Sequence, residues 1–346
     1  MTDRQVSPAS SRPGGHTPVM LAEVIEALAP RDGAIYVDAT FGAGGYAAAI
    51  LDAADCRVWG IDRDREAVAH AAALVRRYSG RLTVIAGRFS AMDRLLGTHG
   101  VTAVDGVTFD LGVSSMQIDD PERGFSFRAD GPLDMRMDPE SGDSATAVVN
   151  ALTEDELANI IARYGEERRA RRVAQAIVAA RREHPIERTL QLAEIVRGVV
   201  KAGRKTTGAS IDPATRTFQA LRIQVNDELG ELERGLRAAE RLLAPDGRLA
   251  VVAFHSLEDR IVKTFLKERA GARPRATRHL PEDTRAPVHE PTFEPIFRGA
   301  CRPGRAERDA NPRARSARLR AARRTAAPPW DRSPGAVPGQ ASGPRP

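Results

Sequence analysis

The sequence lacks the residues that mark a secreted or metal-binding protein. It has two cysteines in 346 residues, Cys56 and Cys301, which lie far apart and form no Cys-x-x-Cys pair. Its seven histidines show no metal-ligand spacing, so we expect neither a metal site nor a disulfide framework. No apolar run approaches the roughly 18 residues of a membrane span, and residues 1–15 are rich in Ser, Pro and Gly and contain no apolar run of the kind that signal peptides have. These absences predict a soluble, cytoplasmic protein without a membrane partner.

Lysine is also scarce, and the basic charge is unevenly placed. Only four of the 52 basic residues are lysines, so 48 are arginines, which bind phosphate bidentately and stack on bases. Residues 271–346 contain 16 arginines against seven acids, whereas residues 1–270 contain 36 basic and 39 acidic residues. This pattern favours a nucleic-acid partner, although a GC-rich genome produces the same preference for arginine.

Short apolar, β-branched runs alternate with helical segments along the chain. The expected strands are residues 34–37, 56–60, 82–86, 104–110 and 249–254. We expect helices between them, including one over residues 66–77 and a long one over residues 215–243. The expected fold class is therefore α/β, with a Rossmann-like sheet.

Far more chain separates the fourth and fifth strands than a crossover needs. About a hundred residues intervene, where a dozen or more suffice. We expect an inserted, mainly helical domain for substrate recognition over residues 116–214, in which a capping box at residues 153–156 starts one helix. Residues 123–138 have little periodicity, as in a functional loop. The remaining chain divides into a sheet domain over residues 16–115 and 215–324 and disordered tails over residues 1–15 and 325–346.

A glycine-rich turn follows the first expected strand. Residues 38–45 read DATFGAGG, and glycine lets backbone N–H groups approach a ligand because it has no Cβ. Asp62 ends the second strand 20 residues after Gly42, the spacing typical of an acid that accepts both ribose hydroxyls. The third glycine of a dinucleotide site is absent. S-adenosylmethionine, which carries no phosphate, therefore fits this turn better than NAD.

Ligands of such sheets lie beyond the carboxyl ends of the strands, which brings further residues to the same rim. Phe89 follows the third strand and either packs on an adenine or belongs to the core. Asp110 directly follows apolar residues of the fourth strand, where an acid is costly without a partner, and is a catalytic candidate. His255 follows the fifth strand as a second candidate. Its alternative is purely structural, because residues 256–259 form a capping box.

Several ordered blocks of the sequence resemble the bacterial RsmH (MraW) family. They are residues 16–21, 38–45, 110–115, 123–127, 131–138, 213–219, 254–260 and 311–316. Members of this family methylate the exocyclic N4 of a cytosine in the decoding centre of 16S ribosomal RNA, using S-adenosylmethionine. The resemblance implies a methyltransferase sheet and 16S rRNA as partner, within the small ribosomal subunit, and it leaves a homodimer open.

The resemblance also implies which residues bind the cofactor. Carried over position by position, they are Gly42, Gly44, Gly45, Tyr46, Asp62, Phe89, Asp110 and Gln117. Two positions depart from the family pattern. Position 46 is Tyr where His is usual, and position 116 is Met where Pro is common.

Substrate contacts are expected from the loop and from the C-terminal region. Amino-methyltransferases of DNA commonly place an aromatic residue shortly after the acid of strand four, but Leu-Gly-Val follows Asp110. We therefore expect Phe125 or Phe127 to stack on the cytosine, which must leave its own stack. Basic residues at 313–320 are expected to contact RNA phosphates. They are Arg313, Arg315, Arg318 and Arg320. The alternative is that they only hold a final strand against the sheet.

Two other functions remain open from the sequence. One is methylation of DNA or a small amine by the same fold, which the arginine-rich C-terminal region and the inserted domain disfavour. The other is a cofactor-binding RNA or ribosome-assembly protein without catalysis. The presence of Asp38, Asp62 and Asp110 together argues against this second alternative.

Overall fold

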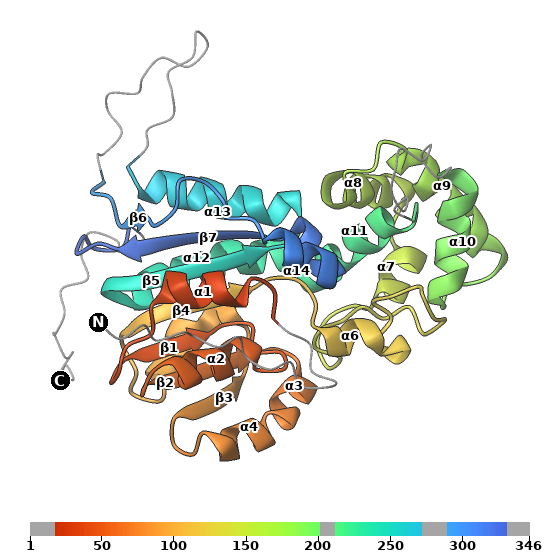
Figure 1. The fold of residues 1–346 in the computed structure, drawn as a ribbon. Coiled ribbons are helices and arrows are strands. Elements are labelled where there is room, and N and C mark those ends of the chain that lie inside the picture. The colour runs from red at the N-terminus through yellow and green to blue at the C-terminus, as the bar shows by residue number, and fades with distance from the viewer. Residues whose placement is uncertain (1–17, 201–211, 272–288, 331–346) are drawn as a thin grey trace, which may run out of the picture.

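A seven-stranded sheet forms the centre of the larger part of the molecule (Figure 1). The structure is a computed structural model that describes residues 18–200, 212–271 and 289–330. The strand order is β3-β2-β1-β4-β5-β7-β6. The strands are β1 (Ile35–Asp38), β2 (Arg57–Asp62), β3 (Leu82–Ala86), β4 (Val104–Asp110), β5 (Leu243–Ala253), β6 (Phe293–Pro295) and β7 (Arg318–Arg324).

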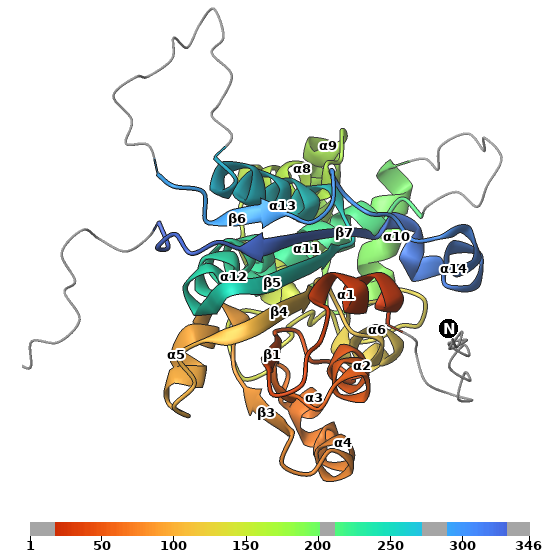
Figure 2. The ribbon, with the colours of Figure 1, turned by 60° about the vertical axis from the view of Figure 1, so that its left-hand side comes forward.

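The direction of the strands confirms the expected parallel sheet and extends it. Strands β1 to β5 pair in parallel, as the apolar runs predict. Strand β7 runs antiparallel to β5 and lies between β5 and β6 (Figure 2). The sheet therefore places the carboxyl ends of five strands at one edge, where a ligand site of this fold class lies.

Helices cover both faces of the sheet with apolar side chains. On one face pack α1 (Leu21–Leu28), α2 (Gly45–Ala53) and α4 (Ala72–Arg77). On the other pack α5 (Met92–Gly97), α12 (Glu228–Leu242) and α13 (Ser256–Arg269). The shorter elements are α3 (Arg65–His70), η1 (Phe89–Ala91), α6 (Ser115–Asp119), η2 (Pro121–Arg123), α14 (Arg305–Ala310) and η3 (Pro312–Ser316).

Five helices form a second part with its own apolar core (Figure 1). They are α7 (Ala145–Ala151), α8 (Glu154–Gly165), α9 (Ala170–Glu183), α10 (Thr189–Val199) and α11 (Thr215–Asn226). The predicted capping box is present at α8, because the Thr153 side chain accepts from the Glu156 N–H while the Glu156 carboxylate accepts from the Thr153 N–H. Among the described helices, none has both the length and the apolar character that crossing a membrane requires.

Two expected helices are interrupted. The segment expected as one helix over residues 215–243 breaks at Asp227, which has a φ of 48°, and so forms α11 and α12. The cause is tertiary, because the Asn226 amide donates to the Met135 carbonyl (2.7 Å) and accepts from the Met137 N–H (2.8 Å). The helix expected over residues 66–77 is likewise divided into α3 and α4.

The expected C-terminal tail is wrong at its start. Trp330 donates its indole N–H to the Glu290 carbonyl (2.9 Å), and the Arg269 guanidinium lies 4.3 Å from the indole centroid. Residues 325–330 are therefore an ordered part of the fold. Residues 331–346 and the expected tail over residues 1–15 lie outside the described residues.

Candidate active site

The end of β1 and the turn after it are tied together by a buried acid. The Asp38 side chain is fully buried and accepts from the N–H groups of Thr40 (3.4 Å) and Ala47 (3.1 Å). Burial raises the pKa of Asp38 to about 7, although the two backbone hydrogen bonds favour its charged form. Asp38 thus fixes the start of α2 against the end of β1.

Two glycines of the turn, Gly44 and Gly45, are required by close packing. Gly44 has a φ of 76°, and a Cβ there would lie 2.5 Å from the Leu74 side chain. A Cβ on Gly45 would lie 2.2 Å from Pro18. At Gly42 the nearest atom to an added Cβ, in Ser114, is 3.8 Å away, so this side of the turn keeps open space.

Asp62 lies opposite this open turn. Its carboxylate accepts from the N–H of Gly42 (2.7 Å) and from the N–H of Asp64 (2.8 Å). Burial raises the pKa of Asp62, although both backbone hydrogen bonds favour the charged form. A carboxylate has about four acceptor positions. Asp62 therefore keeps acceptor capacity for the two hydroxyls of a ribose.

Three other predicted cofactor residues have their side chains engaged by the protein. The Tyr46 hydroxyl is buried and donates to the Val19 carbonyl, which leaves only the backbone of Tyr46 at the turn. The Phe89 ring meets Phe109 edge-on at 5.3 Å between centroids. The Gln117 amide accepts from the Ser114 N–H (3.0 Å) and donates to Asp64 (2.8 Å). Direct contacts of these three side chains with a cofactor stay predictions.

Asp110 has an oxygen without a partner. Its backbone N–H donates to the Thr40 hydroxyl (2.6 Å), whereas its buried Oδ1 finds no hydrogen-bond partner among the described residues. Burial, followed by the charges of Asp38 and Glu258, raises the pKa of Asp110 well above its usual range. An unpaired buried oxygen costs about 1–3 kcal/mol. Such a cost is typical of a group that binds a ligand.

His255 caps α13 instead of standing free. Its Nδ1 accepts from the Glu258 N–H (3.4 Å), and its Nε2 lies 3.1 Å from Glu258 Oε1. The Glu258 carboxylate also accepts from the N–H groups of Phe254 (2.8 Å) and His255 (3.2 Å). The capping box therefore starts one residue earlier than the expected box at residues 256–259. Burial alone would raise the pKa of Glu258, but His255 and Arg222 hold it below its usual value.

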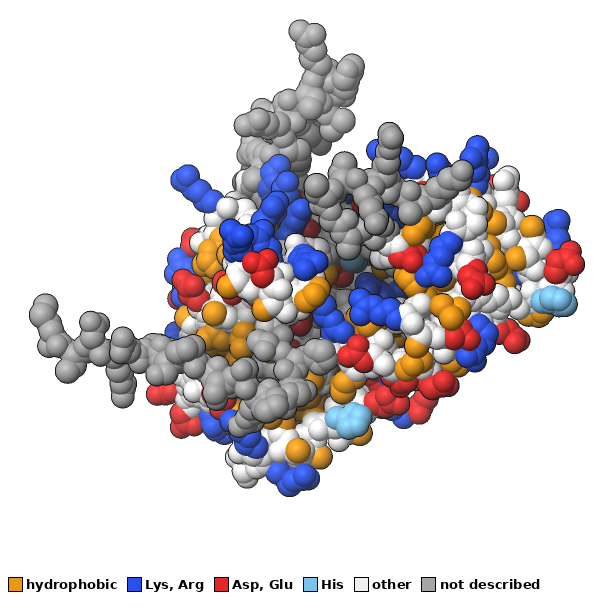
Figure 3. All heavy atoms as spheres, turned by 45° about the vertical axis from the view of Figure 1, so that its right-hand side comes forward, with side chains coloured by type: hydrophobic (Ala, Val, Ile, Leu, Met, Phe, Trp, Pro, Cys, Tyr) orange, Lys and Arg blue, Asp and Glu red, His pale blue; other side chains and the backbone are white. Residues whose placement is uncertain are grey.

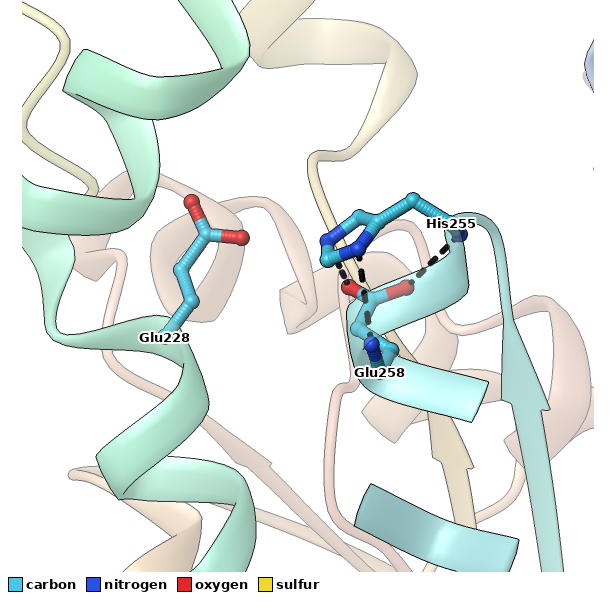
Figure 4. A group of neighbouring side chains, drawn as sticks. All are labelled: Glu228, His255 and Glu258. Atoms are coloured by element: carbon cyan, nitrogen blue, oxygen red, sulfur yellow. Dashed lines mark hydrogen bonds and ion pairs between the residues drawn. The ribbon is translucent and has the colours of Figure 1, made fainter. Parts of the chain in front are cut away.

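Glu228 points toward this pair from α12 (Figure 4). One ligand atom each from Glu228, His255 and Glu258 lie within 4.8 Å of one another, which is a geometry that can hold a metal ion. Glu228 forms two hydrogen bonds with Arg222 (2.7 and 2.8 Å), and Glu258 accepts from the backbone N–H groups at the start of α13, whereas the buried His255 Nε2 finds no hydrogen-bond partner among the described residues. The expected absence of a metal site therefore stays a prediction.

The loop over residues 123–138 joins the two parts of the molecule through Arg123. This buried side chain forms ion pairs with Asp64 (2.9 Å) and Glu66 (3.1 Å) and donates to two loop carbonyls. Phe125 lies under the same guanidinium at 5.9 Å, at the edge of the helical core. The network of Asp64, Gln117 and Arg123 was not predicted, and its only sequence signal is the second acid two residues after Asp62.

Phe127 is held inside the helical part. Its ring lies 4.6 Å from that of Phe218 in α11, and the Arg197 guanidinium lies 5.5 Å above it. Both of these contacts come from helices of the helical part. Of the two predicted stacking residues, only Phe125 contacts Arg123 among the interactions described here. Arg123 in turn binds Asp64, close to the glycine turn, so Phe125 is the residue connected to that turn.

The C-terminal arginines divide into two groups. Arg318 and Arg320 both form ion pairs with Asp259 of α13 at 2.7 Å and so hold β7 against α13. Their contact with RNA phosphate stays a prediction. Arg313 donates to the Ser115 hydroxyl, and Arg315 is exposed. Lys and Arg side chains also gather where the surface is hollowed between the two parts of the molecule (Figure 3).

The fold and the site together define a class of protein. Parallel strands β1 to β5, a glycine turn at the end of β1 and an acid at the end of β2 are the features of a Rossmann-like methyltransferase that uses S-adenosylmethionine. The open turn at Gly42, the acceptor capacity of Asp62 and the unpaired Asp110 oxygen fit that cofactor.

Comparison with known proteins identifies the family. Residues 14–325 match the MraW methylase family, and the chain belongs to it. The chain is 62% identical to the ribosomal RNA small subunit methyltransferase H of Rhodospirillum centenum, over 95% of this chain and 98% of that protein. It is 61% identical to the protein of the same name from Paramagnetospirillum magneticum, over 92% and 98% of the two chains.

Proposed function

We propose that this methylase transfers a methyl group from S-adenosylmethionine to the exocyclic N4 of a cytosine in 16S ribosomal RNA. The observation that carries the proposal is the unpaired, buried oxygen of Asp110 beside the glycine turn. The names of the relatives, which specify the small-subunit ribosomal RNA, support the substrate. The family resemblance supports the N4 position and the decoding centre.

The chemistry requires positioning more than strong base catalysis. A cytosine amine gives its lone pair to the ring and is a poor nucleophile, so the reacting atoms must be held in line. When bound, S-adenosylmethionine supplies an electrophilic methyl group on its sulfonium. Asp110 accepts a hydrogen bond from the amine, which concentrates the lone pair on nitrogen. It then takes the proton that the nitrogen loses after the N–C bond has formed.

The other site residues have supporting roles in this proposal. Gly42, Gly44, Gly45 and the backbone of Tyr46 form the turn beside the cofactor, and Asp62 binds its ribose. Phe89 and Gln117 border the same site, with Gln117 holding Asp64 in place. His255 acts by orienting Glu258, whose charge acts on Asp110. Phe125 or Phe127 stacks on the flipped cytosine.

The helical part is the proposed substrate-recognition domain. Its separate core and its connection through Arg123 to Asp64 support a unit that places RNA over the cofactor site. Because α11 contributes Phe218 and Leu221 to this core, we propose that the domain extends from residue 116 to residue 226. Arg313 and Arg315 add RNA contacts beside it. The substrate is the assembled small subunit in the cytoplasm.

Methyl transfer from labelled S-adenosylmethionine tests this proposal. Purified small subunits that lack the modification, free 16S rRNA, DNA and a small amine are offered in parallel, and the product is digested and analysed by mass spectrometry. We expect N4-methylcytidine from the small subunits alone. Label in DNA or the amine would favour the rival methyltransferase, and cofactor binding without transfer to any substrate would favour the non-catalytic protein.

A further inference from the structure

A hollow of about 190 Å³ lies beside the start of α13, on the side of the sheet where β7 begins. We call it the α13 hollow. Residues at its wall are Phe254, His255, Arg302, Arg308, Arg315 and Arg318. Within the described part of the chain no acidic side chain lines it, and four of its lining residues are arginines. The proposed function uses two of its residues, His255 to orient Glu258 and Arg315 as an RNA contact, but assigns no ligand to the hollow itself.

Three of these arginines have no acidic partner among the residues that the structure describes. They are Arg302, Arg308 and Arg315, and each is exposed. The Arg315 Nε donates to the Arg308 carbonyl (3.3 Å), which fixes one guanidinium at the wall. Arg318 differs because it is already paired with Asp259 at 2.7 Å. Clustered cations repel one another, and their positive potential attracts an anion.

The chemistry of the wall selects the kind of anion. Arginine binds phosphate oxygens through two parallel hydrogen bonds, and three such guanidiniums can surround one tetrahedral group. The α13 hollow also lies near the proposed reacting centre. Phe254 lines it, and the same ring is 3.9 Å from the position of a Cβ on Gly112, two residues after Asp110.

We propose that the α13 hollow binds a backbone phosphate of the RNA strand next to the target cytosine. This inference rests on the proposed function, because it assumes that the target base lies at Asp110. A phosphate held by Arg302, Arg308 and Arg315 fixes the strand while the base turns out of its stack. The hollow then acts as a positioning site that is independent of base identity.

The test compares two arginine variants by fluorescence anisotropy with a labelled single-stranded oligoribonucleotide that contains the cytosine and its neighbours. The test variant combines Arg302→Gln and Arg308→Gln. The matched control is Arg305→Gln, because Arg305 lies on the same helix as Arg308, α14, with a side chain 90% exposed and its Nε 3.7 Å from Asp309. Thermal unfolding checks that both variants are folded.

Each lost phosphate contact should flatten the slope of log K against log[salt] by about 0.7. We expect the double variant to flatten it by about 1.4, which corresponds to roughly 25-fold weaker binding at 0.1 M salt. The control should keep the wild-type slope. If the double variant and the control bind alike, the proposal is wrong. It is also wrong if the wild-type protein does not bind the oligoribonucleotide.

Two further measurements distinguish the strand contact from binding of a free nucleotide and from a failure of the proposed function. Free cytidine monophosphate that binds through the same arginines as tightly as the oligoribonucleotide would assign the hollow to a free nucleotide and overturn the strand contact. Methylation of small subunits by the wild-type protein is measured alongside. A loss of binding in the double variant supports phosphate binding by the α13 hollow. If the wild-type protein methylates no small subunit, that separate result refutes the proposed function and leaves the binding result unchanged.

Discussion

Replacing Asp62 with alanine should weaken cofactor binding without unfolding the protein. The carboxylate accepts from the Gly42 and Asp64 N–H groups at 2.7 and 2.8 Å and keeps acceptor positions for a ribose. Hydrogen bonds to a charged acceptor contribute about 1.5–3 kcal/mol. Loss of the ribose contacts, with some loosening of the Gly42 turn, should cost about 2 kcal/mol, or roughly 30-fold in Kd.

Isothermal titration calorimetry with S-adenosylhomocysteine measures this effect. Asp62→Asn keeps one acceptor oxygen and should lose about half of the 2 kcal/mol, because the remaining bonds are no longer charge-assisted. Asp55→Ala is the control, since the Asp55 side chain lies just before β2 and is 85% exposed. An unchanged Kd in a folded Asp62→Ala variant would falsify the assignment of Asp62 to the ribose.

Three other perturbations test the site and the fold. Asp110→Ala should lower turnover at saturating cofactor. Asp110→Asn should keep part of the turnover, because its amide oxygen still accepts a hydrogen bond from the target amine. Full recovery of turnover by Asp110→Ala with excess cofactor would remove the catalytic role. Because the pKa of Asp38 is about 7 when folded and about 4 when unfolded, the folded state binds the extra proton. The free energy of unfolding should therefore fall by roughly 4 kcal/mol as the pH rises from about 4 to 7. In urea unfolding across this pH range, Asp38→Asn should show a correspondingly weaker dependence of this free energy on pH. Deleting residues 331–346 should leave methylation and the melting temperature unchanged. Trp330→Ala should instead lower the free energy of unfolding by about 1 kcal/mol, because the contact with Arg269 is lost. Equal melting temperatures for Trp330→Ala and wild type would contradict this.

The part of the fold that the sequence predicts is the part set by local patterns. Five apolar runs predict the parallel strands, and the acids Asp38, Asp62 and Asp110 lie at strand ends as expected. A final strand held by Arg318 and Arg320 was only the alternative to RNA contacts, and the structure has this strand as β7. Both arginines form ion pairs with Asp259, a residue of another element that the local sequence does not reveal.

The candidate site shows the same division. The turn glycines and Asp62 follow from motif and spacing. The buried network of Asp64, Gln117 and Arg123 joins distant segments, because Asp64 is 53 residues from Gln117 and 59 residues from Arg123 in the sequence. No local pattern therefore indicates it. The break at Asp227 has a similar cause, since it depends on loop groups that bind the preceding residue.

Mass spectrometry of 16S rRNA tests the central claim most directly. Small-subunit RNA is digested from a strain that lacks this gene and from the same strain carrying either the wild-type gene or the Asp110→Ala form. Our account predicts that one N4-methylated cytidine of the decoding centre is absent from the deletion strain, returns with the wild-type gene and stays strongly reduced with Asp110→Ala. An unchanged level of N4-methylcytidine in the deletion strain would contradict it.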